Sequence, residues 1–307
     1  MKQALKNIAA VSKNAFVLLR RNDPLILAAA TAFFATFSIS PIIVILVNVF
    51  SLYFKSNVIR QRLFRQLETI LGERTTEELE KIVQNFMALK STWWITIAGF
   101  VFLLFVATTL LGVIRKAIHQ LWRLRRKSSI RLKYGVKERL VGLAMLSFIG
   151  LLFLVSQLLD ASMIFLRDYL SELIPSVDAV IIRLINIVFS LLVVTAWFSL
   201  LFKLLPEASI RWRVAFAGGF VTALLFTAGK FLLGRFLINS NIENIFGASA
   251  SIAVLLLFIF YASLIMYYGA AFTYVYGKSI DKPIIAGRLA DEYEERTVVY
   301  KKAEKSG

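Results

Sequence analysis

The sequence contains no cysteine and only one histidine, His119. Without cysteine the chain can form no disulfide bond, no thiolate metal site and no cysteine nucleophile. A single histidine also excludes metal sites that are built from several imidazoles. The P-loop pattern G-x-x-x-x-G-K-S/T and the nucleophile elbow G-x-S-x-G are both absent. We therefore expect no enzyme, and accordingly no catalytic residue, no metal site and no cofactor.

Acidic residues are scarce as well, because 19 Asp and Glu stand against 36 Lys and Arg, giving a net charge of +17. In a soluble protein this charge would suggest a nucleic-acid partner. Here 58% of the residues are hydrophobic, against roughly 45–50% in soluble domains, and the bases flank apolar runs. We interpret the bases as topology signals and contacts to anionic headgroups. The expected partners are membrane lipids, not nucleic acid.

Long uncharged stretches are abundant. Residues 244–277 contain no Asp, Glu, Lys or Arg, whereas a helix needs only about 20 apolar residues to cross a bilayer. Six runs are long enough to span: 25–54, 93–114, 140–166, 180–205, 214–238 and 248–276. Hydrocarbon does not tolerate an open sheet edge, so we expect all six to be helices. The predicted fold class is an all-α membrane protein with six transmembrane helices in one polytopic membrane domain, residues 1–280.

Basic residues gather in alternate connections, which indicates the orientation. The segment before residue 22 holds five bases, and the 115–139 connection holds ten bases against a single acid, Glu138. The opposite connections, 168–179 and 239–247, contain acids and no base. Both termini are therefore expected on the cytoplasmic side, with residues 281–307 as a cytoplasmic tail.

The first outer connection, 55–92, is longer and close to charge balance. Its apolar residues recur at the spacing of two helices. They are Ile59, Leu63, Leu67 and Ile70, followed by Leu79, Ile82, Val83 and Phe86. We predict an amphipathic helical hairpin that lies on the outer membrane surface or caps the bundle. A hairpin with only a packing role is the alternative.

Six polar residues at membrane depth form the candidate substrate-binding site. A rise of about 1.5 Å per helical residue brings all of them into one outer layer. They are Asp160, Gln157, Lys230, Arg235, Arg183 and Asn186. Two interpretations stay open. In the first, these residues line an outward-facing pocket for an anionic amphiphile, and Asp160 pairs with a base when the pocket is empty. In the second, the long basic side chains simply snorkel to headgroups.

Small residues recur every fourth position in three of the runs, which allows close approach of helix backbones. One stripe begins at Ala28, one passes through Gly219, and one begins at Gly269. Proline removes a backbone donor and kinks a helix. The candidate hinge and packing positions are Pro41, Gly219, Gly247 and Gly269.

Four segments carry a family resemblance: DPLILAAATAFFATFSISPIIVIL at 23–46, AIHQLW at 117–122, LLFKLLPEASIRWRVAFAGGFVTALLF at 200–226 and NIFGASASIAVLLLFIFYASLIMYYGAAFTYVYG at 244–277. In order and spacing they resemble the YihY/BrkB family of bacterial inner-membrane proteins, formerly labelled ribonuclease BN-like. Ala271 stands where that family has a glutamate, so no role of that acid is carried over. The resemblance implies a six-helix protein of the bacterial plasma (inner) membrane, with suggested roles in envelope integrity and lipid movement.

Together these features favour a transporter-like protein that moves lipids or other amphiphiles for envelope maintenance. The first alternative is a non-catalytic scaffold that docks an envelope protein partner through the 55–92 connection or the tail. The second is an enzyme, including a ribonuclease.

Overall fold

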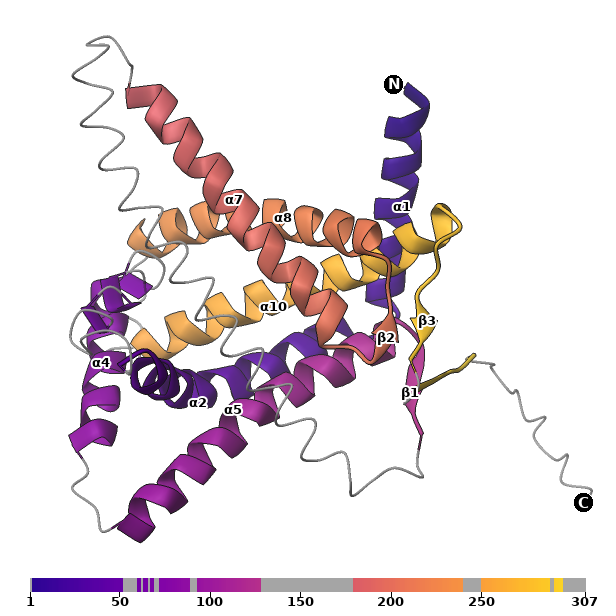
Figure 1. The fold of residues 1–307 in the computed structure, drawn as a ribbon. Coiled ribbons are helices and arrows are strands. Elements are labelled where there is room, and N and C mark those ends of the chain that lie inside the picture. Colours follow the sequence, from indigo (N-terminus) through magenta and orange to yellow (C-terminus); the bar gives the residue numbers. More distant parts are fainter. Residues whose placement is uncertain are drawn as a thin grey trace, which may run out of the picture.

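The structure is a computed structural model, and it describes residues 2–51, 60–88 apart from 62, 66 and 69–71, 93–127, 179–239, 250–287 and 290–294 (Figure 1). The helices are α1 (Lys2–Arg20), α2 (Pro24–Ser51), α4 (Glu73–Ala88), α5 (Trp93–Leu121), α7 (Ala179–Leu204), α8 (Trp212–Asn239) and α10 (Ala250–Ser279). The strands are β1 (Leu124–Arg126), β2 (Ala208–Ser209), β3 (Ile285–Ala286) and β4 (Ala290–Glu292).

The described part is mostly helical, as predicted. Three of its helical segments are long and apolar enough to cross a membrane: Ile187–Leu204, Trp212–Leu233 and Ala250–Ser279. A fourth is added if Asn7–Arg20 and Pro24–Ile39, which meet at 72°, form one broken span. These findings confirm a helical membrane protein. The number of six spans stays a prediction, and the predicted span at 140–166 lies outside the described residues.

The other five predicted spans coincide with α2, α5, α7, α8 and α10. Most helix ends fall within three residues of the prediction. The exception is α5, which extends to Leu121 instead of ending near residue 114. Its last two turns stay helical because one side is buried in the protein, at Ala117, Ile118 and Leu121, while Lys116 is exposed.

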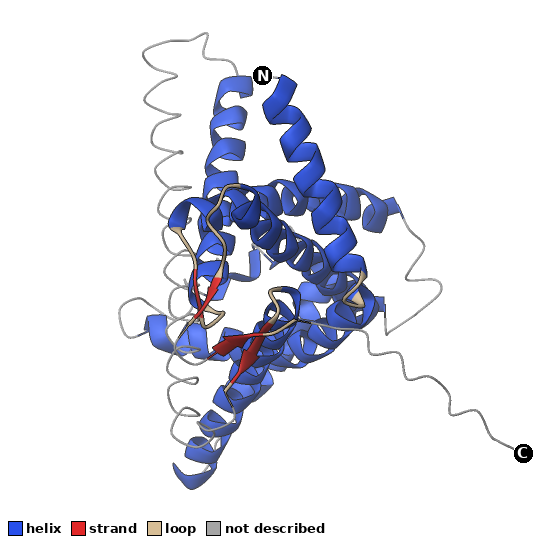
Figure 2. Ribbon diagram, turned by 90° about the vertical axis from the view of Figure 1, so that its right-hand side faces the viewer, coloured by secondary structure: helices blue, strands red, loops and turns tan. Residues whose placement is uncertain are grey.

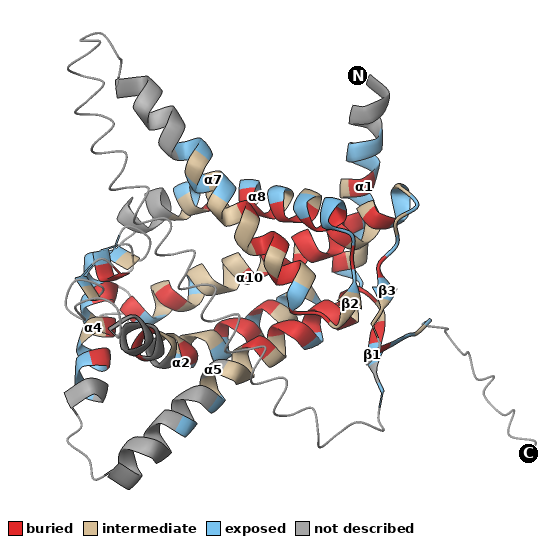
Figure 3. Cartoon of the chain, in the orientation of Figure 1, coloured by how far each residue is buried: buried red, intermediate tan, exposed pale blue. Residues whose placement is uncertain are grey.

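Helix α10 is the centre of the bundle and packs against α1, α2, α5 and α8, while α7 packs on the outside of α8. The buried core lies at one end of these helices (Figure 3). There α5, α7, α8 and α10 come together beside the strands. This end also carries the basic connections, and it is called the basic end below.

Two small antiparallel sheets cover the basic end (Figure 2). Strand β1, after α5, pairs with β4, and β2, between α7 and α8, pairs with β3. The sheets bring together the connection after α5, the connection after α7 and the segment after α10, which the six predicted spans would leave on one side of the membrane. The strands themselves were not predicted, because two or three residues give no detectable period.

Two further helices flank the spans. Helix α4 packs against α2 and α10 and buries Leu79 and Val83, as its apolar spacing predicted, while Ile82 is 43% exposed. The described residues between 60 and 68 are helical too, and Arg60 and Glu80 form an ion pair of 3.7 Å. The hairpin as a whole stays a prediction. Helix α1, which the sequence marked only as a basic segment, packs against α10.

Candidate functional site

The structure describes the predicted site residues to different extents. Lys230 lies on α8 with a half-buried side chain. Arg235 lies further along α8, and Arg183 and Asn186 lie on α7, but the side chains of these three are outside the described residues. Asp160 and Gln157 lie outside the described residues altogether.

The six predicted site residues can meet only if the helices at 140–166, 180–205 and 214–238 are neighbours. Of these, α7 and α8 are antiparallel neighbours joined by the turn that carries β2, and residues 140–166 lie outside the described residues. Asn186 lies 18 residues before the last residue of α7, and Lys230 lies 18 residues after the first residue of α8. Both positions are therefore about 27 Å along their helices from the basic end. The two positions are therefore equally far along their own helices from the turn that joins α7 and α8.

Lys230 stands at the border between two sides of α8. The preceding Gly229 is buried and lies directly against the phenol of Tyr261 on α10. The following Phe231 and Leu232 are 62% and 72% exposed. With respect to the described residues, Lys230 forms no ion pair. Lys230 is therefore half-buried and has no counter-ion among the described residues.

The burial of α10 changes along its length, and the change falls about as many residues from the basic end as Lys230 does on α8. Its start is buried at Ala250, Ser251 and Leu255, where α10 meets α4. It is buried again at Ser263, Met266 and Tyr267, and from residue 269 to residue 273. Between these two parts, residues 256–262 are half-buried or exposed although α10 is the central helix. We call residues 256–262 together with Lys230 the outer band.

Tyr261 belongs to the outer band, and sequence reasoning missed it. Its hydroxyl lies 3.5 Å from the backbone oxygen of Leu225 on α8. A tyrosine inside an apolar run resembles ordinary core, and its only sequence signal is a polar atom at the depth of Lys230. The band thus brings together an amine, a phenol and apolar side chains, which are groups that suit an amphiphile with an anionic head.

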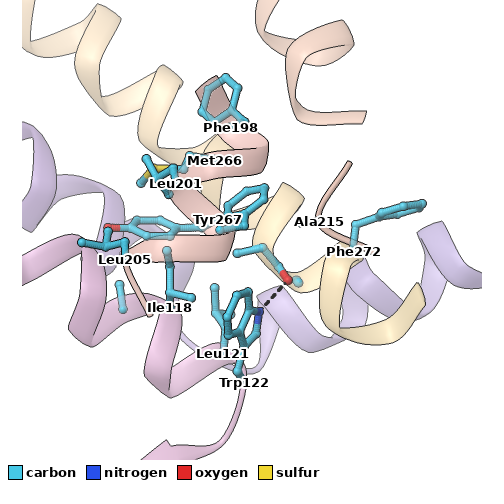
Figure 4. Packing of buried hydrophobic residues seen from close by; sticks show 14 of the residues in the cluster. Ile118, Leu121, Trp122, Phe198, Leu201, Leu205, Ala215, Met266, Tyr267 and Phe272 are labelled. Carbon is cyan, nitrogen blue, oxygen red and sulfur yellow. Dashed lines mark hydrogen bonds between the residues drawn. The ribbon is translucent and has the colours of Figure 1, made fainter. Parts of the chain in front are cut away.

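At the basic end the helices pack tightly around a buried core. The indole of Trp122, 1% exposed, donates a hydrogen bond of 2.8 Å to the backbone oxygen of Ala270 (Figure 4). Tyr267 is fully buried, and its hydroxyl hydrogen-bonds to the hydroxyl of Thr31 on α2. These contacts tie α5 and α2 to α10 across the core.

Helices α8 and α10 approach closely through a reciprocal pair of glycines and threonines. Gly218 on α8 faces Thr273 on α10, and Gly269 on α10 faces Thr222 on α8. Each threonine hydroxyl donates to the glycine oxygen four residues earlier in its own helix, at 2.7 Å. The hydroxyls are therefore satisfied within their helices, and the contact is a packing surface.

Of the three remaining hinge and packing candidates, the structure describes contacts for one, only the backbone for another, and nothing for the third. Gly219 lies against Thr195 and Ser199 of α7. Helix α2 continues through Pro41 without interruption, although the side chain of Pro41 is outside the described residues. Gly247 lies outside the described residues altogether.

Two cationic or titratable side chains lie in the basic end rather than on its surface. Arg115 and His119, four residues apart on α5, are each 8% exposed. The described part of the chain contains no group of three or more His, Asp or Glu side chains that could hold a metal ion.

Several curated membrane proteins are similar to this chain. A UPF0761 membrane protein of Pseudomonas paraeruginosa is 29% identical over 250 residues, which are 79% of this chain and 57% of that protein. One from Legionella pneumophila is 26% identical over 85% of this chain and 62% of its own length. One from Tolumonas auensis is 26% identical over 82% of this chain and 80% of its own length.

The chain thus spans about three fifths of the length of the Pseudomonas and Legionella relatives. No solved structure matches it. The model of the family described as virulence factor BrkB matches residues 16–290, which is most of the sequence and includes every described helix except most of α1. The chain therefore belongs to the BrkB family of membrane proteins.

Proposed function

We propose that this protein moves a lipid or another anionic amphiphile across a bacterial inner membrane. In this proposal six helices span the bilayer, both termini and the basic end face the cytoplasm, and the outer band faces outward. The chain acts without catalysis, and the 55–92 connection caps the bundle. The outer band of α10 is the single observation that carries the proposal.

Three features support this assignment of the outer band. A transporter needs a region within membrane depth that is less tightly packed than its core, and the band is bounded by the core on one side and by α4 on the other. It contains Lys230, a cation that is costly at this depth unless it meets a partner. An anionic headgroup would supply that partner, and the neighbouring apolar side chains would contact the acyl chains.

Reconstitution of the full chain in liposomes tests the proposal. Fluorescent phosphatidylglycerol is placed in one leaflet, and its transfer to the other leaflet is followed by quenching from outside. We expect transfer well above that of protein-free liposomes. Folded, inserted protein that transfers no lipid would refute lipid movement and favour the scaffold.

Replacing Lys230 by alanine should slow this transfer about tenfold, because a hydrogen bond to a charged group contributes about 1.5–3 kcal/mol. Lys230→Arg keeps the charge and should retain most of the activity. Lys116→Ala removes an exposed base near the basic end and is the matched control. If Lys230→Ala transfers lipid at the wild-type rate, Lys230 does not belong to the site.

A further inference from the structure

Helix α1 leaves the bundle at an angle that sets it apart from the spanning helices. It meets α2 at 72°, at a corner where Asp23 has a left-handed φ of 47° and Pro24 begins α2. The side chain of Asn22 closes the end of α1 by donating to the backbone oxygen of Leu18 at 2.8 Å. The hydrogen bond of Asn22 and the left-handed conformation of Asp23 thus fix the corner between α1 and α2. Helix α1 runs across the basic end rather than along the bundle (Figure 1).

One face of α1 is apolar over its whole described length, but the protein covers only part of it. Val11, Ala15 and Leu19, spaced four apart, are buried where α1 packs on α10. Ile8 shares this face, three residues before Val11, and yet it is 53% exposed. Next to the same face, Phe16 is 58% exposed. The apolar face therefore continues beyond the part that the described residues of the bundle cover.

The rest of α1 is strongly basic. Lys13, Arg20 and Arg21 are exposed, and the helix carries Lys2 and Lys6 nearer its start. The first acidic residue of the chain is at position 23, so no carboxylate offsets these charges within α1. Long basic side chains beside an apolar face are typical of helices that lie in the headgroup region.

We infer that α1 lies in the plane of the membrane and binds the anionic phospholipid headgroups of the leaflet at the basic end. Ile8 and Phe16 enter the boundary between headgroups and acyl chains, and Lys13 and Arg20 contact the phosphates. The alternative, in which α1 and the first part of α2 form one broken span, would carry Lys13 into hydrocarbon, where a cation is disfavoured. This inference concerns anchoring and is independent of lipid transport.

The natural absence of cysteine makes the test direct, because single cysteines can be introduced into the full chain without removing others. Ile8→Cys and Asn14→Cys place a polarity-sensitive fluorophore on the apolar and the polar side of α1. The labelled proteins are reconstituted in vesicles of phosphatidylglycerol with phosphatidylcholine, and in phosphatidylcholine alone. An aqueous quencher and a quencher at the bilayer centre report the depth of each label.

With phosphatidylglycerol present, we expect the label at position 8 to be protected from both quenchers and the label at position 14 to be open to the aqueous one. In phosphatidylcholine alone, aqueous quenching at position 8 should rise about threefold, since each base near an anionic surface contributes to binding. The double variant Lys13→Glu/Arg20→Glu should abolish this dependence on lipid charge. Lys116→Glu/Lys278→Glu, which reverses two exposed bases elsewhere near the basic end, should preserve it.

Three results would overturn the inference. Strong quenching at position 8 from the bilayer centre would place α1 in a broken span. Equal aqueous quenching at positions 8 and 14 in both lipid mixtures would place α1 in water. Protection that follows the density of protein in the vesicle, and not the lipid charge, would assign the face to a second copy of the chain.

Discussion

Replacing Trp122 by alanine is expected to lower the free energy of unfolding by about 3–5 kcal/mol, the cost of removing a large aromatic side chain from a packed core. Trp122 is 1% exposed and follows directly on α5, among Ile118, Leu121 and Tyr267 (Figure 4). Its indole also provides the hydrogen bond to Ala270 that joins α5 to α10. The substitution therefore removes both side-chain volume and a hydrogen bond at the basic end of the bundle.

Two variants separate these contributions. Trp122→Phe keeps an aromatic ring but loses the N–H donor, so we expect a smaller loss of about 1–2 kcal/mol. Trp212→Ala removes the same residue type from a position that is 48% exposed and should change stability little. Thermal unfolding in detergent, followed by the loss of monodisperse protein, measures all three. Equal losses for Trp122→Ala and Trp212→Ala would show that the cluster at the basic end does not hold the fold together.

The apolar runs predicted most of the helices. A spanning segment must form its backbone hydrogen bonds within itself, so it can be recognised by its length and its apolar composition. The same reasoning missed α1. That helix is too polar to be read as a span, and its helical state depends on the contact of Val11, Ala15 and Leu19 with α10. The strands at the basic end were missed for a similar reason, since their pairing joins segments far apart in the sequence.

Small-residue spacing predicted positions of close approach but not their partners. The predicted stripe through Gly219 faces α7, at Thr195 and Ser199. The contact of α8 with α10 instead uses the adjacent stripe of Gly218 and Thr222. Because α8 lies between two helices, it needs two such stripes, and spacing alone cannot assign each to a neighbour.

For the candidate site, the sequence predicted the depth of Lys230 by counting residues along a helix. It also set the condition that three helices are neighbours, of which α7 and α8 pack together and the third lies outside the described residues. The sequence could not predict the uneven burial of α10 or the position of Tyr261 against Gly229. These features depend on how far neighbouring helices cover α10, which is a tertiary property.

Replacing Gly219 by valine is expected to destabilise the protein by about 3 kcal/mol or more, or to prevent folding. A Cβ atom at position 219 would lie 2.8 Å from the backbone nitrogen of Ser199 and 2.9 Å from the backbone oxygen of Thr195. A flexible side chain could rotate away from such a contact, but backbone cannot. Helices α7 and α8 would have to separate, at a cost above the roughly 1–3 kcal/mol of ordinary overpacking.

Gly112→Ala on α5 is the matched control, because a Cβ at position 112 meets nothing within 4 Å. Alanine is the better helix former by roughly 0.5–1 kcal/mol, so this variant should be as stable as the wild type or slightly more stable. Gly219→Ala should already be destabilised, since the clash involves the Cβ atom itself. Gly219→Val protein that unfolds at the wild-type temperature would mean that α7 and α8 are further apart than this packing requires. The close packing of α7 on α8 described above would then be wrong.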